Sequence, residues 1–425
     1  MTIALFLLVL IVSIVIGIPI AWSLMLSGVA LMLHLNMFNG QIIAQNMIFG
    51  TDNFIFLAIP FFILAGELMN KGGLSKRIID VAIAAFGHIK GGLGYVGIFA
   101  ALIMASLSGS AIADSAALTA ILIPMMRMAR YPEGHSGGLL AAGGVIAPVI
   151  PPSIALVVFG AVANISINGL FMAAIVPGLL MAVALVLMWR FIARNGDYET
   201  LEKQPRTAVL SALVKGIPAL VLPVVVIGGM RVGIFTPTEA AVIAVIYAWF
   251  VGMFVYRELT LKELYSALVE AGKTSAVVMF LVGTSMISAW LISIANLPTE
   301  IIKLLTPLLD SPKTLLTAIL AMTLALGMVL DFTPLMLILM PIMIPLCRAA
   351  HIDMTYFGVL FTIAGALGML TPPVGNVLNV VSGVGNIRTD RIIAGVMPFL
   401  WVQILVLVLL IIFPQIVMIP MSLLS

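Results

Sequence analysis

A long internal repeat constrains this chain more than any other feature of its sequence. Residues 331–398 match residues 110–177 at a fixed offset of 221, and the matching positions are mainly prolines and glycines. Because these residues interrupt helices, the repeated unit is predicted to be a set of broken helices in apolar sequence. A duplication of this kind is typical of secondary transporters. The clearest matches are Pro124 with Pro345, Arg127 with Arg348, Gly144 with Gly365, Pro151-Pro152 with Pro372-Pro373, and Pro177 with Pro398.

The composition places the chain in a lipid bilayer. Of its 425 residues, 63% are hydrophobic and only 9% are charged, whereas about 25% of the residues of a soluble domain are charged. The net charge of +3 is spread along the chain, and no basic stripe with interleaved aromatic residues indicates nucleic-acid binding. The four histidines lack the spacing of a transition-metal site. No phosphate-binding loop is present, so the chain is not expected to hydrolyse ATP.

Apolar segments long enough to span a bilayer recur along the whole chain. We predict an all-α polytopic membrane protein with two inverted-topology repeats, each containing a re-entrant helical hairpin. The predicted divisions are N-terminal scaffold helices at 1–53, a first repeat at 54–190, a cytoplasmic linker with connecting scaffold helices at 191–273, and a second repeat at 274–425. The hairpins are predicted at about 106–130 and 327–350, and the broken helices at about 137–165 and 355–385.

The orientation follows from basic residues in short loops, because lysine and arginine concentrate on the cytoplasmic side of the membrane. The polar stretch at 190–215 is rich in both and is predicted to be cytoplasmic. The arm at 72–91, which ends near Lys90, is also basic. The equivalent arm at 297–313, which ends at Lys313, has no net charge and is predicted to be periplasmic. The second repeat is therefore expected to run opposite to the first.

A polar, interrupted zone lies in the first half of the chain. Ser106, Ser108 and Ser110 surround Gly109, and Asp114 follows one turn later. Small hydroxyl residues and glycine let a helix unwind and release backbone carbonyls within the membrane. Carbonyl and hydroxyl oxygens are hard ligands that suit a cation such as Na⁺.

The second half carries an equivalent zone from Gly327 to Pro334. At the repeat offset, Asp331 takes the place of Ser110, and Thr333 supplies a hydroxyl. A carboxylate at membrane depth is costly unless it is paired or coordinates an ion, so Asp114 and Asp331 are predicted to be functional. The alternative is that each only caps the N-terminus of a helix.

A double proline follows each zone, at 151–152 and at 372–373. Two adjacent prolines remove two amide donors and end a helix, which frees the preceding carbonyls to face an ion. The alternative is a simple kink. In the second half Thr371 adds a hydroxyl, and Asn376 and Asn379 follow as neutral groups available to a substrate.

Three further polar residues allow more than one interpretation. Arg127 and Arg348 follow the second arm of each predicted hairpin. They are interpreted as caps of backbone carbonyls or as interfacial anchors, with substrate binding as the alternative. Asn164 lies beyond the first double proline and is predicted either to line a cavity or to form a turn.

Four segments of the chain resemble the large membrane subunit of tripartite ATP-independent periplasmic (TRAP) transporters. They are Ser-Leu-Ser-Gly-Ser-x-x-x-Asp at 106–114, Pro-x-x-Pro-Pro-Ser at 148–153, Gly-x-Phe-Thr-Pro-Thr-Glu at 233–239, and Thr-Pro-Pro-Val-Gly-Asn-x-Leu-Asn at 371–379. The resemblance covers essentially the whole chain. It implies a Na⁺-driven importer of organic acids in the bacterial inner membrane, which works by an elevator movement and is not an enzyme.

The resemblance also implies partners and a substrate class. The partners are a small four-helix membrane subunit, expected here as a separate polypeptide, and a periplasmic substrate-binding protein. The expected substrate is a sugar acid such as sialic acid, with a C4-dicarboxylate as the other option, transported together with at least two Na⁺.

The resemblance distributes the expected site residues over the two halves of the chain. One Na⁺ site is expected at Ser106, Ser108, Ser110, Gly144 and Pro148. The other is expected, mainly through backbone oxygens, at Asp331, Thr333, Gly365, Gly368, Met369 and Thr371. Substrate contacts are expected from Asp114, Ser153, Asn164, Asn376 and Asn379.

Two other classes of protein remain as alternatives. An intramembrane enzyme would need a nucleophile with its base, or a metal cluster, in one place. A passive channel would conduct its solute without Na⁺ and without a binding protein. Flux into liposomes with and without a Na⁺ gradient separates these classes from a coupled transporter.

Overall fold

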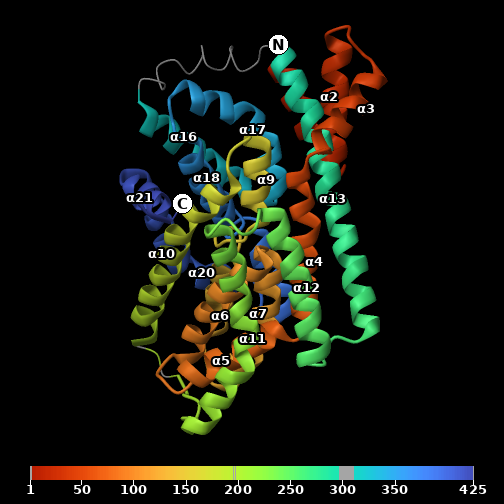
Figure 1. The fold of residues 1–425 in the computed structure, drawn as a ribbon. Helices are drawn as coiled ribbons and strands as arrows, with labels where there is room; N and C mark the ends of the chain where they lie inside the picture. Colours follow the sequence, from red (N-terminus) through yellow and green to blue (C-terminus); the bar gives the residue numbers. More distant parts are fainter. Residues whose placement is uncertain (1, 195, 197, 296–310, 425) are drawn as a thin grey trace.

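The computed structural model describes residues 2–194, 196, 198–295 and 311–424, whose regular elements are all helices. Among these residues, eight helices are long and apolar enough to span a membrane. The fold is the predicted all-α arrangement of two inverted repeats with two re-entrant hairpins (Figure 1). Most of the predicted periplasmic arm at 297–313 lies outside the described residues.

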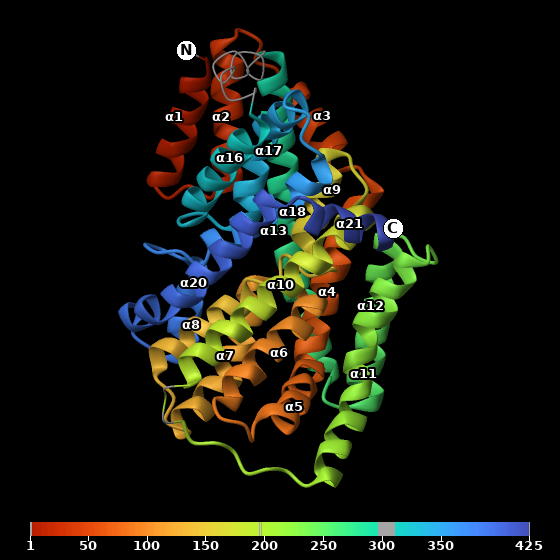
Figure 2. The same ribbon diagram turned by 90° about the vertical axis from the view of Figure 1, so that its left-hand side faces the viewer.

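Eight of the described helices lie outside the hairpins and broken helices, with α1 and α2 at the upper left of Figure 2 and α11 and α12 at its right. Gly17, with a φ of +88°, and Pro19 lie between the first two of these helices. Thr236 and Glu239 form a capping box that begins α12. These helices are α1 (Thr2–Val15), α2 (Ile20–His34), α3 (Gly40–Thr51), α4 (Ala58–Lys71), α5 (Leu74–Phe86), α11 (Arg206–Arg231), α12 (Pro237–Phe250) and α13 (Leu261–Ile294).

The first repeat continues through a hairpin, a broken helix and a long span. The hairpin consists of α6 (Gly92–Ser108) and α7 (Ala111–Met128), joined at Gly109 and Ser110. The broken helix consists of α8 (Glu133–Gly144) and α9 (Ile154–Ala163), and the span is α10 (Ile167–Arg194). The predicted range of 106–130 therefore covers only the tip and second arm of this hairpin, because the apolar first arm looks like an ordinary span in the sequence.

The second repeat has the same elements at the same offset. Residues 332–349 of α17 lie 221 positions after residues 111–128 of α7, and both helices have 18 residues. Here too the hairpin begins earlier than predicted, with its turn at 328–331. The elements are α16 (Pro312–Gly327), α17 (Phe332–Ala349), α18 (Met354–Gly368), α19 (Asn376–Gly385), α20 (Thr389–Ile412) and the terminal α21 (Gln415–Leu424).

The two broken helices form the centre of the molecule. Every residue from 136 to 150 and from 356 to 371 is buried, as expected for helices that are apolar on all sides. Small residues allow close packing there. A Cβ on Gly138 of α8 would lie 2.6 Å from the carbonyl carbon of Gly395 in α20. The double prolines after α8 and α18 each contain a cis peptide bond.

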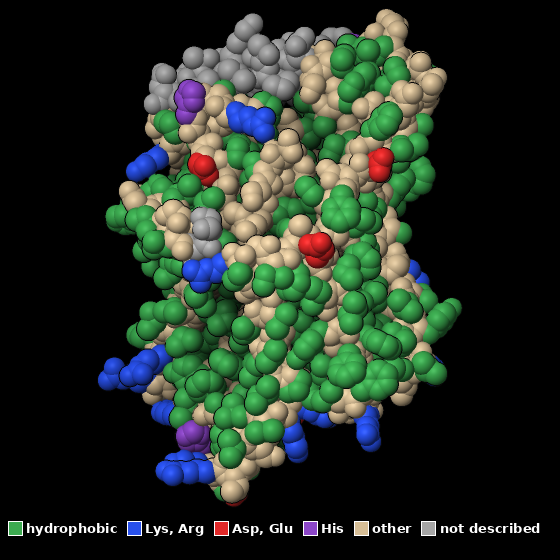
Figure 3. All heavy atoms as spheres, in the orientation of Figure 1, with side chains coloured by type: hydrophobic (Ala, Val, Ile, Leu, Met, Phe, Trp, Pro, Cys, Tyr) green, Lys and Arg blue, Asp and Glu red, His purple; other side chains and the backbone are tan. Residues whose placement is uncertain are grey.

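The two hairpins enter from opposite ends of the molecule. In Figure 1 the α5 end is at the bottom, from which α6 and α7 extend upward, whereas α16 and α17 lie near the top. Lysine and arginine side chains gather at the lower end (Figure 3), the distribution that the positive-inside rule predicts for a cytoplasmic end.

Cysteine labelling tests this orientation. Single cysteines at positions 90 and 313, in a Cys347→Ala background, should differ in their reaction with a membrane-impermeant thiol reagent in intact cells. Lys90 lies between α5 and α6 at the lower end, and Lys313 lies in the first turn of α16 at the upper end. Position 313 should be labelled, and position 90 only after permeabilisation. Equal labelling in intact cells would contradict inverted repeats.

Candidate functional site

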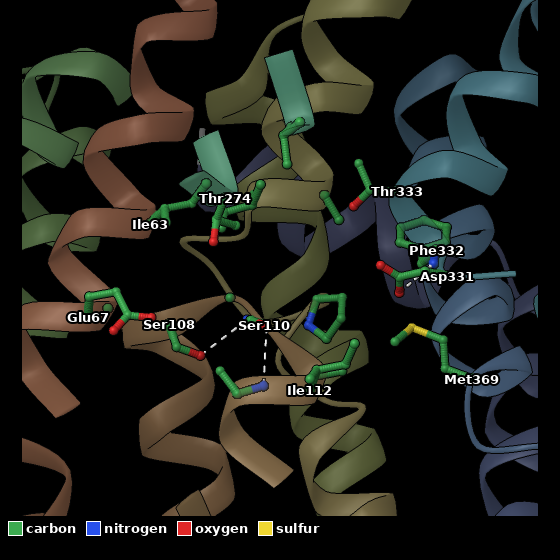
Figure 4. Close-up of a pocket in the computed structure, with 18 of the residues that line it drawn as sticks. Ile63, Glu67, Ser108, Ser110, Ile112, Thr274, Asp331, Phe332, Thr333 and Met369 are labelled. Carbon is green, nitrogen blue, oxygen red and sulfur yellow. Dashed lines mark hydrogen bonds between the residues drawn. The ribbon is translucent and has the colours of Figure 1, made fainter. Parts of the chain in front are cut away.

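A cavity of about 360 Å³ lies where the two hairpin tips face α4 and α13. Figure 4 shows Glu67 and Ser108 on one side of this cavity, and Asp331, Thr333 and Met369 on the other. The cavity is therefore lined by both repeats. The full lining is Ile63, Gly66, Glu67, Asn70, Ser108–Ala113, Pro148, Ile154, Ala155, Thr274, Val278, Asp331, Phe332, Thr333 and Met369.

A network of short polar contacts shapes the first hairpin tip. The Ser108 hydroxyl donates to Asp114 Oδ1 at 2.5 Å and accepts the Ser110 N–H at 3.1 Å. Ser110 Oγ accepts the Ala113 N–H at 3.3 Å and thereby caps α7. Gly109 between the two serines has a φ of +61°, in the left-handed region that favours glycine. The prediction that this zone is an unwound turn is confirmed.

Behind this tip, three polar atoms on α7 are buried and have no hydrogen-bond partner within the described residues. They are Asp114 Oδ2, Ser115 Oγ and Thr119 Oγ1. Gly144 of α8 lies against the same group, because a Cβ at this position would overlap Ser115 Oγ. Buried polar atoms are nearly always satisfied in proteins, so this carboxylate oxygen and these two hydroxyls are candidate contacts for a bound ligand. Sequence analysis did not assign Ser115 or Thr119, since isolated hydroxyl residues also serve as small packing residues in membrane helices.

The second hairpin tip presents a carboxylate in place of the serine hydroxyls. Asp331 is the N-cap of α17, and its Oδ1 accepts the Phe332 N–H at 2.9 Å. Asp331 therefore caps a helix and also lines the cavity. Its interpretation as a helix cap does not exclude its interpretation as a functional residue. Thr333 and Met369 also line the cavity.

The remaining residues expected at the second Na⁺ site pack around this tip without lining the cavity. A Cβ on Gly365 would overlap the Phe332 ring, and one on Gly327 would lie 3.0 Å from Gly368 Cα. The Thr371 hydroxyl donates to the Leu367 carbonyl at 2.7 Å. The glycines thus let α18 approach the hairpin tip closely, and the threonine hydroxyl serves its own helix.

Most residues expected at the first Na⁺ site do gather at one place. Ser108, Ser110 and Pro148 line the cavity, and Gly144 lies just behind it. Ser106 is one turn below the tip and donates to the Ile103 carbonyl at 2.6 Å.

None of the five residues expected to contact substrate lines the cavity. Asp114 is buried behind the first tip, and Ser153 is the buried N-cap of α9, with its hydroxyl 2.5 Å from the Pro148 carbonyl. Asn164 ends α9 in a left-handed conformation, and is therefore a turn residue. Asn376 and Asn379 lie in the first turn of α19.

Instead, α4 and α13 supply three polar cavity residues that sequence analysis missed. They are Glu67, Asn70 and Thr274. None of them belongs to a recognisable motif, so only the packing of α4 and α13 against the hairpins reveals their place.

The cavity wall combines negative side chains with the N-terminal ends of helices. Among the residues that the structure describes, its lining contains two carboxylates, Glu67 and Asp331, and no lysine or arginine. The first turns of α7, α9 and α17 also reach the cavity wall. Helix N-termini carry unpaired N–H groups and about half a positive charge each, so they attract anions.

Arg127 and Arg348 do not belong to the cavity. The Arg127 guanidinium donates to the Asn386 carbonyl at 2.9 Å, and that of Arg348 donates to the Ala163 carbonyl at 3.1 Å. Their interpretation as carbonyl caps is confirmed.

Inverted repeats whose broken helices meet at an internal cavity define a secondary transporter. The match to known proteins narrows this class. Residues 7–416 match the family described as tripartite ATP-independent periplasmic transporter, DctM component. The chain belongs to this family of TRAP transporter large permease subunits. It is accordingly a transport subunit for organic acids in the inner membrane and not an enzyme, and the family works with a small membrane subunit and a periplasmic binding protein.

Several relatives match almost from end to end. The 2,3-diketo-L-gulonate TRAP transporter large permease protein YiaN of Escherichia coli is 50% identical, over 99% of both chains. The sialic acid TRAP transporter large permease protein SiaM of Vibrio cholerae is 40% identical, over 94% of this chain and 93% of that one. The C4-dicarboxylate TRAP transporter large permease protein DctM of Pseudomonas aeruginosa is 34% identical, over 91% of each.

A solved structure shares the fold at low sequence identity. The YdaH transporter of Alcanivorax borkumensis superposes with a TM-score of 0.59, at 13% identity, over 87% of this chain and 86% of that chain.

Proposed function

We propose that this chain imports a sugar-derived organic acid together with Na⁺, by an elevator movement of the hairpins and broken helices. The observation that carries the proposal is the composition of the cavity wall, which combines carboxylates and helix N-termini and, within the described part of the chain, contains no basic side chain. An organic anion held between Glu67 and Asp331 would be repelled unless cations bind with it. This charge balance supports coupling to a cation, which we propose is Na⁺.

The two hairpin tips are the places for these cations. At the first tip, the unpartnered Asp114 Oδ2 and Ser115 Oγ lie behind Ser108 and beside Gly144. We assign Asp114 to this ion site and not to the substrate. At the second tip, Asp331 reaches the cavity itself. One Na⁺ at each tip would neutralise the local carboxylate and leave the helix N-termini to hold the substrate carboxylate.

The substrate we propose is a six-carbon keto acid similar to 2,3-diketo-L-gulonate. That compound is named for a relative with 50% identity, whereas the relative named for sialic acid has 40% identity and the one named for C4-dicarboxylates 34%. The cavity volume of about 360 Å³ lies near the lower end of the ~300–1,000 Å³ typical of small-molecule sites. A compact six-carbon acid is compatible with this volume.

Reconstitution tests the proposal directly. Proteoliposomes should contain the chain with its small subunit, and the external medium should contain the binding protein loaded with labelled 2,3-diketo-L-gulonate. Uptake should require an inward Na⁺ gradient and the binding protein. Uptake that persists without both would indicate a passive channel, and chemical conversion of the solute would indicate an enzyme.

The elevator movement requires the hairpin tip to slide past a fixed helix. We propose that α4 is that helix and belongs to a scaffold formed by the N-terminal helices, α11, α12 and α13. A Cβ on Gly66 of α4 would lie 3.4 Å from Ser108 Cα, so backbone faces backbone at this contact. Such smooth contacts are suited to a sliding surface, because no side chain has to be lifted out of a groove.

A leucine at position 66 should therefore lower the rate of uptake at least about tenfold, the effect of ~1.4 kcal/mol on a rate. Because Gly66 also lines the cavity, thermal stabilisation by substrate is measured alongside uptake, to separate blocked sliding from blocked binding. The matched control is Gly283→Leu in α13, where a Cβ would also lie 3.4 Å from its neighbour, Thr51 Cγ2. That contact lies within the proposed scaffold, and uptake should persist. Equal loss in both variants would count against α4 as the sliding surface.

A further inference from the structure

Two short helices, α9 and α19, each contact the hairpins of both repeats. Each of α9 and α19 has 10 residues and begins just after a double proline. A helix of this length spans about 15 Å and is marginally stable on its own. How its two ends are held therefore decides where it lies.

The N-terminal end of each short helix contacts the hairpin tip of its own repeat. At the start of α9, a Cβ on Gly109 would lie 3.1 Å from the Ile154 nitrogen. At the start of α19, the Gly375 N–H donates to the Met328 carbonyl at 3.1 Å, in the turn of the second hairpin.

The C-terminal end of each short helix is held by the opposite repeat. Arg348, near the end of α17, donates to the Ala163 carbonyl at the end of α9. Arg127, near the end of α7, donates to the Asn386 carbonyl at the end of α19. A cation at a helix C-terminus satisfies an orphan carbonyl and interacts favourably with the helix dipole. Each repeat thus supplies an arginine that caps the short helix of the other repeat, and the two caps lie at opposite ends of the molecule.

We propose that Arg127 and Arg348 are positioning residues that act in a crossed manner, each through the short helix of the other repeat. Arg348 holds α9, whose first turn rests on the Ser108 tip, so it supports the first ion site. Arg127 holds α19, whose start is bonded to the turn before Asp331, so it supports the second ion site. Each ion site therefore depends on both repeats, which couples the two sites. This inference rests on the proposed Na⁺ coupling.

The surroundings of Arg127 make its substitution interpretable. Arg127 also pairs with Glu133 at 2.8 Å, and Glu133 is held at 3.2 Å by Arg391 as well. Arg127→Gln removes the cap but leaves Glu133 with a cationic partner. Arg130 offers a matched control, because it lies three residues further on and pairs only with the exposed Glu199 at 2.9 Å among the described residues.

Double-mutant cycles on the Na⁺ dependence of uptake test the crossed pattern. The concentration of Na⁺ at half-maximal uptake should rise about two- to fivefold in Arg127→Gln and in Arg348→Gln, as expected for the loss of one charged helix cap. Ser108→Ala perturbs the first site and Thr333→Ala the second. Arg348→Gln should be non-additive with Ser108→Ala and additive with Thr333→Ala, and Arg127→Gln should show the reverse. Lysine at either position should restore part of the effect, and Arg130→Gln should behave as the unmodified protein.

Other outcomes would distinguish a failure of the arginine inference from a failure of the proposed Na⁺-coupled function. A purely structural role would lower thermal stability in both arginine variants without any crossed preference, and would overturn this inference alone. Uncrossed coupling, in which Arg127 affects the first site, would also overturn it. Uptake by the unmodified protein that ignores Na⁺ would overturn the proposed function, and this inference with it.

Discussion

Asp331→Ala is expected to remove most Na⁺-dependent uptake while leaving the protein folded. Asp331 is the only ionisable residue that the second hairpin tip contributes to the cavity wall. Contacts to charged groups contribute about 1.5–3 kcal/mol each, which corresponds to about a 10- to 100-fold loss of Na⁺ affinity. The measurement is initial uptake into proteoliposomes over a range of Na⁺ concentrations, at matched protein incorporation.

A second aspartate provides the control for the loss of a helix cap. Asp353 is the N-cap of α18, with its Oδ1 2.8 Å from the Tyr356 N–H, and it does not line the cavity. Asp353→Ala should cost about 1 kcal/mol of stability, as N-cap substitutions do, and leave the Na⁺ dependence unchanged. If Asp331→Ala retained the Na⁺ dependence of the unmodified protein, Asp331 would be a cap and nothing more.

The fold was predictable from the sequence because helix interruptions are encoded locally. Glycine in the left-handed region and a double proline favour the end of a helix, and Gly109 and both double prolines do lie between helices. The offset of 221 carries over to the bounds of α7 and α17, whereas the single prolines Pro124 and Pro345 lie inside these helices and do not end them. The first arms of the hairpins were not recognised, because α6 and α16 are apolar helices of 17 and 16 residues that resemble spanning segments.

The cavity was predictable only in part, because local patterns do not show which side chains face it. Ser108 and Asp331 stand out as polar groups in broken, apolar sequence, and both reach the cavity. Ser153 and Asn164 stand out in the same way, yet they serve the two ends of α9. Serine and asparagine beside a helix break are favoured both as caps and as ligands, so the sequence alone does not distinguish the two roles.

No local sequence pattern indicated that α4 contributes residues to the cavity wall. Glu67 lies one turn before Lys71, with 3.9 Å between their charged atoms, so in the sequence this pair resembles an exposed ion pair at a helix end. Its place in the cavity wall results from contacts between helices that are distant in sequence. Such contacts depend on the packing of the whole molecule, which residue spacing within one helix does not specify.

Gly109→Val should abolish transport while leaving membrane insertion and expression intact. Gly109 has a φ of +61°, and a β-branched side chain is disfavoured there. A Cβ at this position would also lie 3.1 Å from the Ile154 nitrogen and 3.2 Å from the Pro152 carbonyl oxygen. The strained backbone would open the hairpin tip and separate Ser108 from Asp114. We expect uptake to fall by at least about 100-fold, the effect of ~2.7 kcal/mol on a rate.

Gly233→Val is the control that distinguishes disruption of the first hairpin tip from the general effect of a strained backbone. Gly233 has a φ of +75°, but a Cβ there would meet no atom within 4 Å, and the residue lies in the turn before α12, away from the cavity. Both variants carry the same kind of strain, and only Gly109→Val displaces a hairpin tip. Uptake and thermal stability are measured for both in proteoliposomes. Loss of uptake confined to Gly109→Val, at similar thermal stability, would place the unwound turn in the transport mechanism. Normal uptake by this variant would mean that the tip tolerates a regular helical backbone, and the first ion site would then have to be assigned elsewhere.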